Sequence, residues 1–374
     1  MLIEIHMLKN YQPTNLNRDD TGAPKTCMFG GVQRGRISSQ CLKHSWRTSG
    51  LLSDAIGSKQ IGVRTRKLPD LVGEALAAKG VKEEYITALQ KNLTGIGTKD
   101  GKENKDGKTA QVIAYSPEDI QAITDLIMEK LENCKTVKDA EKIKAKDLQD
   151  ILGKNTKRSV TLDMALFGRM VTSDAFADVE AAMQVAHAIS TNRVYMESDY
   201  FTAVDDLIDG SETETGSAMI GDIDYNSSCY YMYASLDTDK LRENLQYNDD
   251  AEEIMKKIIP VLVETMAMTN PSGKQNSFAG HSLPSAVLVE CKEKHIPVSY
   301  ANAFEEPVKP EKGHGLVYGS ICALKQECES IAADFGLAVE KRLWFSRDAS
   351  VSFGEDMAVN CRNFRELLDQ IPQV

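Results

Sequence analysis

A basic run that contains no acidic residue occupies residues 36–47, RISSQCLKHSWR. If a helix begins at Ser38, three polar or basic side chains spaced three and four residues apart share one of its faces. These are Gln40, Lys43 and Arg47. Leu42 and Trp46 form an apolar face beside them. Free N–H groups at a helix start and cations along one face are both phosphate-binding groups, so the segment predicts contacts to a phosphate backbone.

Further cations precede this helix, and they make the first part of the chain positive. They are Arg18, Lys25, Arg34 and Arg36. Residues 1–67 hold eleven Lys or Arg against four Asp or Glu, or +7, although the whole chain carries −11. Charges act on a ligand within a Debye length of ~8 Å, so the acidic total does not exclude an anionic partner. An ordinary solvated surface is the alternative interpretation of this charge.

The segment from residue 194 to 259 is the opposite, with sixteen acids against four bases. It contains the aromatic cluster of DYFTAVDDL, in which Tyr200 and Phe201 have no obvious core to enter. Such rings stack on or wedge between bases, or dock on a neighbouring subunit.

Catalytic and metal-binding patterns are weak. The glycine-rich segment 95–109 fails the Walker spacing, the cysteines form no C-x-x-C pair, and no G-x-S-x-G motif occurs. Asp19 and Asp20 are the one acidic pair considered for divalent-metal or acid-base chemistry, and orientation of their loop is the favoured alternative. The sequence therefore predicts no cofactor, no metal and no enzymatic activity.

The composition indicates a soluble protein of two or three lobes. The N-terminus lacks a secretion signal, no apolar run reaches the roughly 18 residues of a membrane span, and eight cysteines are scattered. Reduced cysteines and these absences predict a cytoplasmic protein that does not contact membranes.

The pattern of elements predicts an α+β sheet domain with insertions, close to the split βαβ class. Strands are expected at residues 2–8, in VTLDMALFGRMVTS with its turn, in SSCYYMYASLD and in SAVLVECKE. Helices are expected from Ser38 to Gly50, across a lobe at about 68–157, in VEAAMQVAHAIST and in AEEIMKKIIPVLVETMAM. Residues 10–35 are predicted to be an irregular loop, and residues 194–223 a hairpin-like excursion.

Long stretches of the chain resemble one family. NLNRDDTGAPKTCMFGGVQRGRISSQCLKHSWR, LDMALFGRMVTSD, AMQVAHAIST, DYFTAVDDL and SYANAFEEPV closely resemble the CasC family, the repeated backbone subunit of the subtype I-E CRISPR complex Cascade. The resemblance covers most of the chain outside the helical lobe, and motifs of this length in this order are specific.

The resemblance implies a hand-shaped fold. An RRM-like (ferredoxin-like) palm would comprise residues 1–67, 161–193 and 224–374, with a helical finger insertion at 68–160 and a thumb hairpin at 194–223. It also implies partners: CRISPR RNA, further copies of the chain, other Cascade subunits, target DNA through the guide, and a recruited helicase-nuclease or other effector of antiviral defence.

Site residues follow from the same resemblance. Arg18, Lys25, Ser38, Gln40, Lys43 and Arg47 would hold the RNA backbone in the palm, with Arg34 and Arg36 beside them. Met164 and Arg169 would contribute from a finger-side loop, and Lys274 and Gln275 from NPSGKQNS. Tyr200, Phe201 and Thr202 would displace a base of the guide. Lys138, Lys142 and Lys146, at four-residue spacing, would contact target DNA, although acids among them favour a solvated helix.

Overall fold

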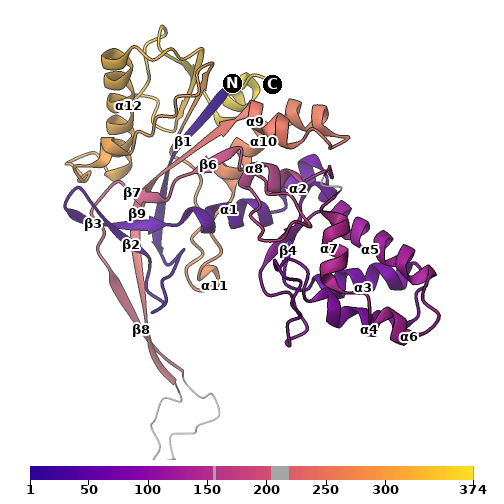
Figure 1. The fold of residues 1–374 in the computed structure, drawn as a ribbon. Coiled ribbons are helices and arrows are strands. Elements are labelled where there is room, and N and C mark those ends of the chain that lie inside the picture. Colours follow the sequence, from indigo (N-terminus) through magenta and orange to yellow (C-terminus); the bar gives the residue numbers. More distant parts are fainter. Residues whose placement is uncertain (155–156, 204–218, 374) are drawn as a thin grey trace, which may run out of the picture. The chain divides into compact units, whose positions relative to one another are not determined.

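The computed structural model describes residues 1–154, 157–203 and 219–373, and this part of the chain forms two compact units (Figure 1). Unit 1 comprises residues 1–49, 185–235 and 259–372, and unit 2 comprises residues 50–184, 236–258 and 373. The predicted helical insertion, 68–160, lies in unit 2, which also includes residues 50–67 and 161–184. The predicted thumb, 194–223, is described except for residues 204–218.

Unit 1 is built on a large, mostly antiparallel sheet with the strand order β12-β11-β10-β1-β9-β7-β3-β2, and β6 and β8 pair with β9 beside this path. The β11–β12 pair is parallel, whereas the pairs β1–β10, β10–β11, β2–β3, β3–β7 and β7–β9 are antiparallel. The strands are β1 (Leu2–Thr14), β2 (Thr26–Phe29), β3 (Val32–Ile37), β6 (Met183–Val185), β7 (Ala188–Ser190), β8 (Glu197–Ala203), β9 (Met219–Asp237), β10 (Ala286–Lys292), β11 (Lys341–Ser346) and β12 (Val359–Cys361).

Helices accompany this sheet. They are α1 (Ser39–Thr48), α11 (Gln275–Phe278), the 3-10 helix η2 (Ala301–Phe304), α12 (Leu316–Phe335) and α13 (Phe364–Gln370). Helix α10 (Ala251–Met268) begins in unit 2 and ends in unit 1. Both faces of β1 are buried, and one of them packs with η2 and α12 in a core that contains Leu8, Phe304 and Leu324.

Buried charges share that face of the sheet. Glu4 accepts from Lys292 and from the Tyr233 hydroxyl, while Glu290 pairs with Arg342 (2.6 Å) and Lys292 (3.6 Å). Burial works to raise the pKa of Glu290, but His6, Arg342 and Lys292 together hold that pKa below its usual range. Two carboxylates therefore face two cations, and buried charges persist only when they are paired in this way.

The β2–β3 hairpin turns at Gly30 and Gly31, both with positive φ (58° and 73°), as a two-residue hairpin loop of the primed type requires. A side chain at Gly30 would collide with the carbonyl oxygen of Glu305, so the hairpin lies directly against the end of η2. Glycine is therefore needed at residue 30 both for the positive φ and for the close approach to Glu305.

Arg34 on β3 fixes this arrangement. Its side chain is fully buried, and its five N–H groups donate to five backbone carbonyls in three separate segments. The acceptors are Phe29 (3.2 Å), Ser190 (3.1 Å), Thr191 (2.9 Å), Phe304 (2.7 Å) and Glu305 (2.9 Å). The guanidinium thus joins the end of β2, the end of β7 and the end of η2.

Unit 2 is mainly helical. Its elements are α2 (Leu51–Ile56), the 3-10 helix η1 (Ser58–Gln60), β4 (Val63–Thr65), α3 (Leu68–Ala78), α4 (Glu83–Leu93), β5 (Ile113–Tyr115), α5 (Pro117–Glu132), α6 (Val137–Ala140), α7 (Ala145–Leu152), α8 (Leu162–Phe167) and α9 (Thr238–Asn244). Leu76, Leu89, Ile127 and Leu148 are among its buried core residues. Helix α5 begins with a capping box of Ser116 and Asp119.

Three secondary-structure predictions are wrong, and several others are confirmed. VTLDMALFGRMVTS forms helix α8, VEAAMQVAHAIST contains strands β6 and β7, and residues 10–35 contain the end of β1 and the β2–β3 hairpin. Strand β7 pairs with both β3 and β9, so tertiary pairing overrides the helical periodicity of its sequence. The predictions for α1, α10, β9 and β10 are confirmed.

No helix among the described residues is both long enough and apolar enough to span a bilayer.

Replacing Arg34 with Met would remove five hydrogen bonds to backbone carbonyls, three of which belong to the buried residues Ser190, Thr191 and Phe304. We expect Arg34→Met to lower the free energy of unfolding of unit 1 by about 3 kcal/mol or more. Both tryptophans, Trp46 and Trp344, lie in unit 1, so tryptophan fluorescence during urea denaturation follows this unit.

The matched control is Arg18→Met, because Arg18 is exposed and should change the same free energy by less than about 0.5 kcal/mol. A loss of under about 1 kcal/mol in Arg34→Met would contradict the role assigned to this guanidinium.

Candidate nucleic-acid interface

Helix α1 forms as the spacing predicts. Ser38 is the N-cap, and its hydroxyl accepts from the backbone N–H of Cys41 (3.3 Å). Leu42 and Trp46 are buried, which leaves the predicted polar face outward. On that face Gln40 is exposed, and Lys43 and Arg47 are half-buried. Partial burial lowers the pKa of Lys43.

A loop before the hairpin is tied to the start of α1. The Asn17 side chain accepts from the backbone N–H of Ser38 (2.9 Å), and the Asn17 carbonyl accepts from the backbone N–H of Lys25 (2.8 Å). Asp19 closes the loop by accepting from the Thr21 hydroxyl (2.7 Å) and backbone N–H (2.9 Å). The Thr21 hydroxyl is the largest cause of the lowered pKa of Asp19. Arg18 and Asp20 are exposed on the same loop.

A second loop, residues 270–280, lies against the first. A side chain at Gly273 would collide with the carbonyl oxygen of Leu16, which shows how closely the two backbones approach. Gln275 holds this second loop in shape, because its amide donates to the carbonyls of Pro271 (2.7 Å) and Gly280 (3.2 Å). Lys274 is half-buried and adopts the left-handed conformation (φ 49°) at the start of α11.

These parts surround one cavity of about 530 Å³. The first loop contributes residues 16–22, helix α1 contributes Cys41, and the second loop contributes Ser272 and Gly273. The structure therefore brings Arg18, the first turn of α1 and the loop that carries Lys274 to one place in unit 1. The lining holds one cation, Arg18, and the two carboxylates of Asp19 and Asp20, next to the start of α1. A guanidinium beside a helix start is an arrangement that can hold a phosphate group.

Arg34 and Arg36 have structural roles. Arg34 is fully buried and donates only to backbone carbonyls, so the expectation that it contacts RNA is replaced by its role in the sheet. Arg36 is half-buried and donates to the Thr26 carbonyl (3.1 Å) and to His187 Nδ1 (3.0 Å). Partial burial, and then the charge of Arg36, lower the pKa of His187, which favours the neutral imidazole as acceptor.

Met164 and Arg169 belong to unit 2 and are both buried. Arg169 pairs with Asp119 (2.6 Å), which also accepts from Arg158 (3.2 Å). Both guanidinium groups lie over the ring of Phe176, at 5.6 and 5.8 Å from its centroid. Arg169 therefore stabilises the core beside α5, and its side chain is not presented at the surface.

The lysines expected to contact target DNA do not share one helix. Lys138 lies on α6, Lys142 follows α6, and Lys146 lies on α7, so the four-residue spacing does not create a common helical face. All three are exposed; Lys142 pairs with Asp139 (2.9 Å) and Lys146 with Asp150 (3.4 Å). These exposed ion pairs fit the alternative interpretation, in which the lysines belong to a solvated surface.

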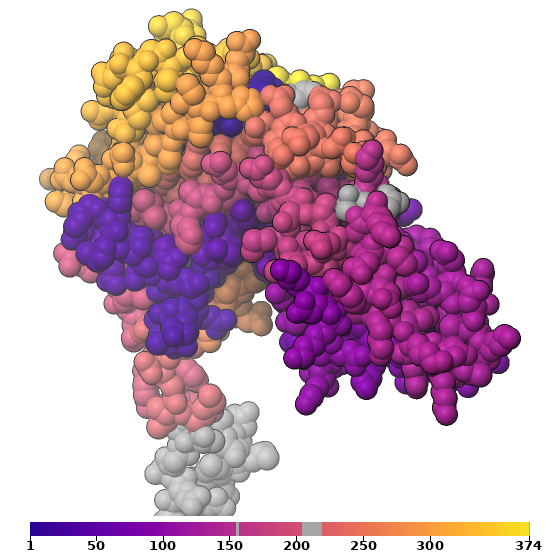
Figure 2. Space-filling view, in the orientation of Figure 1, coloured from indigo at the N-terminus to yellow at the C-terminus, as the bar shows by residue number. Residues whose placement is uncertain are grey.

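The predicted thumb contains a two-stranded ribbon of β8 and β9, which extends beyond the neighbouring strands of the sheet (Figures 1 and 2). Tyr200 pairs with Asp222, Phe201 with Gly221 and Thr202 with Ile220. Tyr200 is 65 % exposed and Ile220 62 % exposed, so the ribbon presents apolar side chains to solvent. The ring of Phe201 lies over Gly221, where an added Cβ would come within 2.6 Å of the ring.

The sequence did not indicate the uncharged residues that shape the cavity. Asn17 positions the helix start, and Ser272 and Gly273 line the cavity although they lie some 250 residues away in sequence. No local pattern marks them, because their contribution comes from a contact between two loops.

The family and structure matches each extend over nearly the whole chain. The model of the CT1975-like protein family matches residues 3–370. One solved structure described as "CRISPR RNA-guided surveillance complex, pre-nicking" contains a chain with a TM-score of 0.81 and 24 % identity, covering 99 % of this chain and 98 % of that one. Another, described as "CRISPR RNA-guided surveillance complex", gives a TM-score of 0.60 and 20 % identity, covering 99 % and 97 %. No curated protein matches this sequence.

At these identities the two structures establish a common fold. The family match extends over nearly all of the sequence, and this protein therefore belongs to the CT1975-like protein family.

Proposed function

We propose that this chain is a non-catalytic backbone subunit of a Cascade-type CRISPR complex, which binds CRISPR RNA and polymerises along it. One observation carries the proposal: the loop of Arg18, the start of α1 and the loop of Lys274 surround a single cavity in unit 1. Support also comes from the shared fold with subunits of structures described as CRISPR RNA-guided surveillance complexes.

The RNA backbone would lie along the outer face of α1. Lys43 and Arg47 are one helical turn apart, a rise of about 6 Å, which is close to the spacing of successive phosphates in an extended strand. These contacts hold phosphates and leave base edges untouched, so they are independent of the guide sequence. A guide held in this way keeps its bases available for pairing with DNA.

The RRM-like palm is supported by strand order. β10-β1-β9-β7 is the spatial order 4-1-3-2 of a βαββαβ unit, with α1 after β1 and α10 after β9. Typical RRM domains stack bases on an open sheet face. Here both faces of β1 are buried, so the ligand would use the helix and the loops instead.

The ribbon of β8 and β9 would contact the next copy along the guide. Three of its apolar side chains, those of Tyr200, Met219 and Ile220, are exposed. A head-to-tail contact of this kind generates an open helical filament when its rotation does not close. Tyr200, Phe201 and Thr202 would displace a guide base where the ribbon meets the strand.

Finer features of the proposal come from the sequence resemblance to the CasC family. They are subtype I-E, presentation of the guide to target DNA, recruitment of a helicase-nuclease or other effector, and a cytoplasmic location.

Metal-dependent RNA cleavage by Asp19 or Asp20 is the competing function. It is favoured by the position of both carboxylates in the lining of the cavity. One oxygen of the Asp19 carboxylate, Oδ1, accepts three hydrogen bonds from Thr21 and Ala23, which form its turn. This geometry supports a loop-closing role for Asp19.

Reversing the charge of Lys43 and Arg47 together should weaken RNA binding and flatten its salt dependence. For a single strand, each lost phosphate contact reduces the slope of log K against log salt by about 0.7. Fluorescence anisotropy with labelled CRISPR RNA at several salt concentrations measures both quantities. Lys256→Glu with Lys257→Glu changes the net charge equally at exposed positions of α10 and should leave the slope unchanged. Equal slopes in both double variants would refute the site.

Removing the ring of Phe201 should disturb assembly without unfolding the subunit. We expect Phe201→Ala to keep the wild-type thermal unfolding midpoint within a few degrees, yet to lose the regular nuclease-protection pattern of the bound guide. Phe335→Ala removes an exposed ring from α12 and serves as the control. An unaltered footprint in Phe201→Ala would argue against a wedge at this position.

The absence of catalysis is tested by incubating the assembled protein with complementary RNA and either Mg²⁺ or Mn²⁺. We expect the RNA to remain intact, since Asp19 is bound within its own turn. Periodic cleavage that disappears in Asp19→Ala or Asp20→Ala would overturn the non-catalytic assignment.

A further inference from the structure

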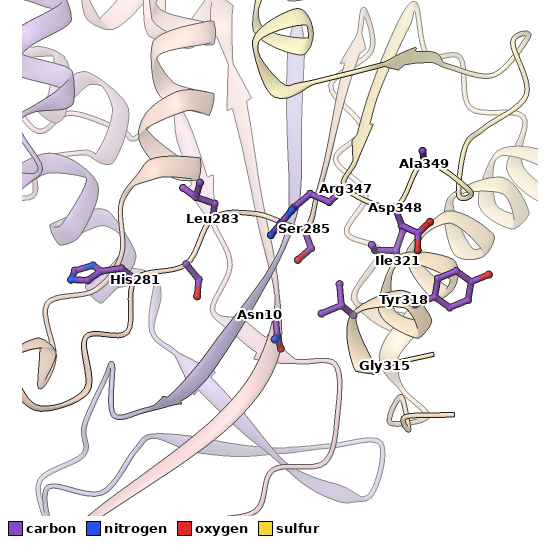
Figure 3. Close-up of a pocket in the computed structure, with 12 residues that line it drawn as sticks. Asn10, His281, Leu283, Ser285, Gly315, Tyr318, Ile321, Arg347, Asp348 and Ala349 are labelled. Carbon is purple, nitrogen blue, oxygen red and sulfur yellow. The ribbon is translucent and has the colours of Figure 1, made fainter. Parts of the chain in front are cut away.

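A second cavity of about 840 Å³ lies in unit 1, away from α1 (Figure 3). Its walls are the segment 281–285 before β10, the first turns of α12 and the segment 347–349 after β11, and Asn10 of β1 also lines it. The segment 270–285 therefore serves both cavities, since its Ser272 and Gly273 line the first.

Ser285 is the buried polar group of this cavity. Ser285 is 6 % exposed, and its backbone carbonyl accepts from the backbone N–H of Arg347 (2.9 Å). No group of the described chain is hydrogen-bonded to its hydroxyl. Because Ser285 lines the cavity, its hydroxyl can donate to or accept from a ligand atom there. Figure 3 places Ser285 between Arg347 and Asn10.

Two features of the walls favour a phosphate. The Arg347 side chain is exposed and carries a fork of N–H donors that matches phosphate oxygens. Helix α12 is twenty residues long, its N-cap Gly315 supplies no side chain to the first turn, and that turn contains no acid. The open N–H groups of such a turn attract an anion. Open space surrounds the Cα of Gly315, so these groups are accessible.

The remaining groups favour a ribose and a base. Asp348 lines the cavity beside Arg347, and one of its carboxylate oxygens is occupied by Ser350. A carboxylate repels a bare phosphate but accepts from ribose hydroxyls, so its presence fits a ligand that carries both groups. The ring of Tyr318 also lines the cavity and stacks on His314 at 4.2 Å, which gives an aromatic surface for a base.

We propose that this cavity binds a ribonucleotide, with its phosphate on Arg347 and the start of α12, its ribose on Asp348 and its base against Tyr318. Ser285 and Asn10 supply hydrogen bonds from the floor. The site goes beyond the proposed backbone function, because none of these groups belongs to the interface around α1. Its ligand is either a free nucleotide or one nucleotide of an RNA strand, and both present the same chemistry.

The test uses adenosine 5′-monophosphate as the probe and isothermal titration calorimetry on the full chain. We expect Arg347→Glu to weaken binding at least tenfold, and Lys43→Glu with Arg47→Glu to leave it unchanged. Adenosine, which lacks the phosphate, should bind at least tenfold more weakly than the probe. 2′-Deoxyadenosine 5′-monophosphate should bind several-fold more weakly, and Asp348→Asn should remove most of that difference.

Unchanged binding in Arg347→Glu, or equal binding of the ribo and deoxy probes, would overturn the proposal. Arg347 is exposed, and tryptophan fluorescence confirms that the variant is folded; Ser285→Ala provides a second variant with the same expected direction. A short 5′-phosphorylated RNA, titrated in the Lys43→Glu and Arg47→Glu background, separates the two sources. Displacement of the probe identifies a strand as the ligand, and retention of the probe identifies a free nucleotide.

Discussion

The five hydrogen bonds of the Arg34 guanidinium are the interaction on which the architecture of unit 1 depends. They join the β2–β3 hairpin, the end of β7 and the end of η2 through the carbonyls of Phe29, Ser190 and Phe304. A guanidinium offers five donors in one plane, so a single side chain bonds to backbone carbonyls of all three segments. Because β3 leads directly into α1, the same contacts fix the origin of the proposed RNA-binding helix.

A second set of buried charges lies among strands β1, β10 and β11, toward the other end of the sheet from the β2–β3 hairpin. Glu4, Glu290, Lys292 and Arg342 lie on the face of β1, β10 and β11 that η2 and α12 cover. Removing one partner leaves a buried charge uncompensated, which lowers the free energy of unfolding. A change of strand register would separate the partners in the same way. Together with Arg34 they join strands of unit 1 to one another and to η2.

Two cavities of unit 1 are its candidate ligand sites. One lies between the loop of Arg18, α1 and residues 272–273, and the other lies between residues 281–285, the start of α12 and residues 347–349. The segment 270–285 contributes to both, so a shift of this segment would affect both sites. Acidic residues concentrate in residues 194–259, and α1 itself contains no acid, but Asp19 and Asp20 line the cavity next to it.

The sequence by itself determined the local features. The serine cap, the apolar positions Leu42 and Trp46, and the basic face of α1 follow from helical spacing alone, and the apolar runs of β9, β10 and α10 mark their elements. Tertiary structure decided the rest. Strands β6 and β7 form because neighbouring strands pair with them, and Arg34 and Arg169 are cations whose sequence context does not distinguish a buried hub from a ligand contact. Their roles depend on carbonyls and carboxylates contributed by distant segments, and no local pattern carries that information.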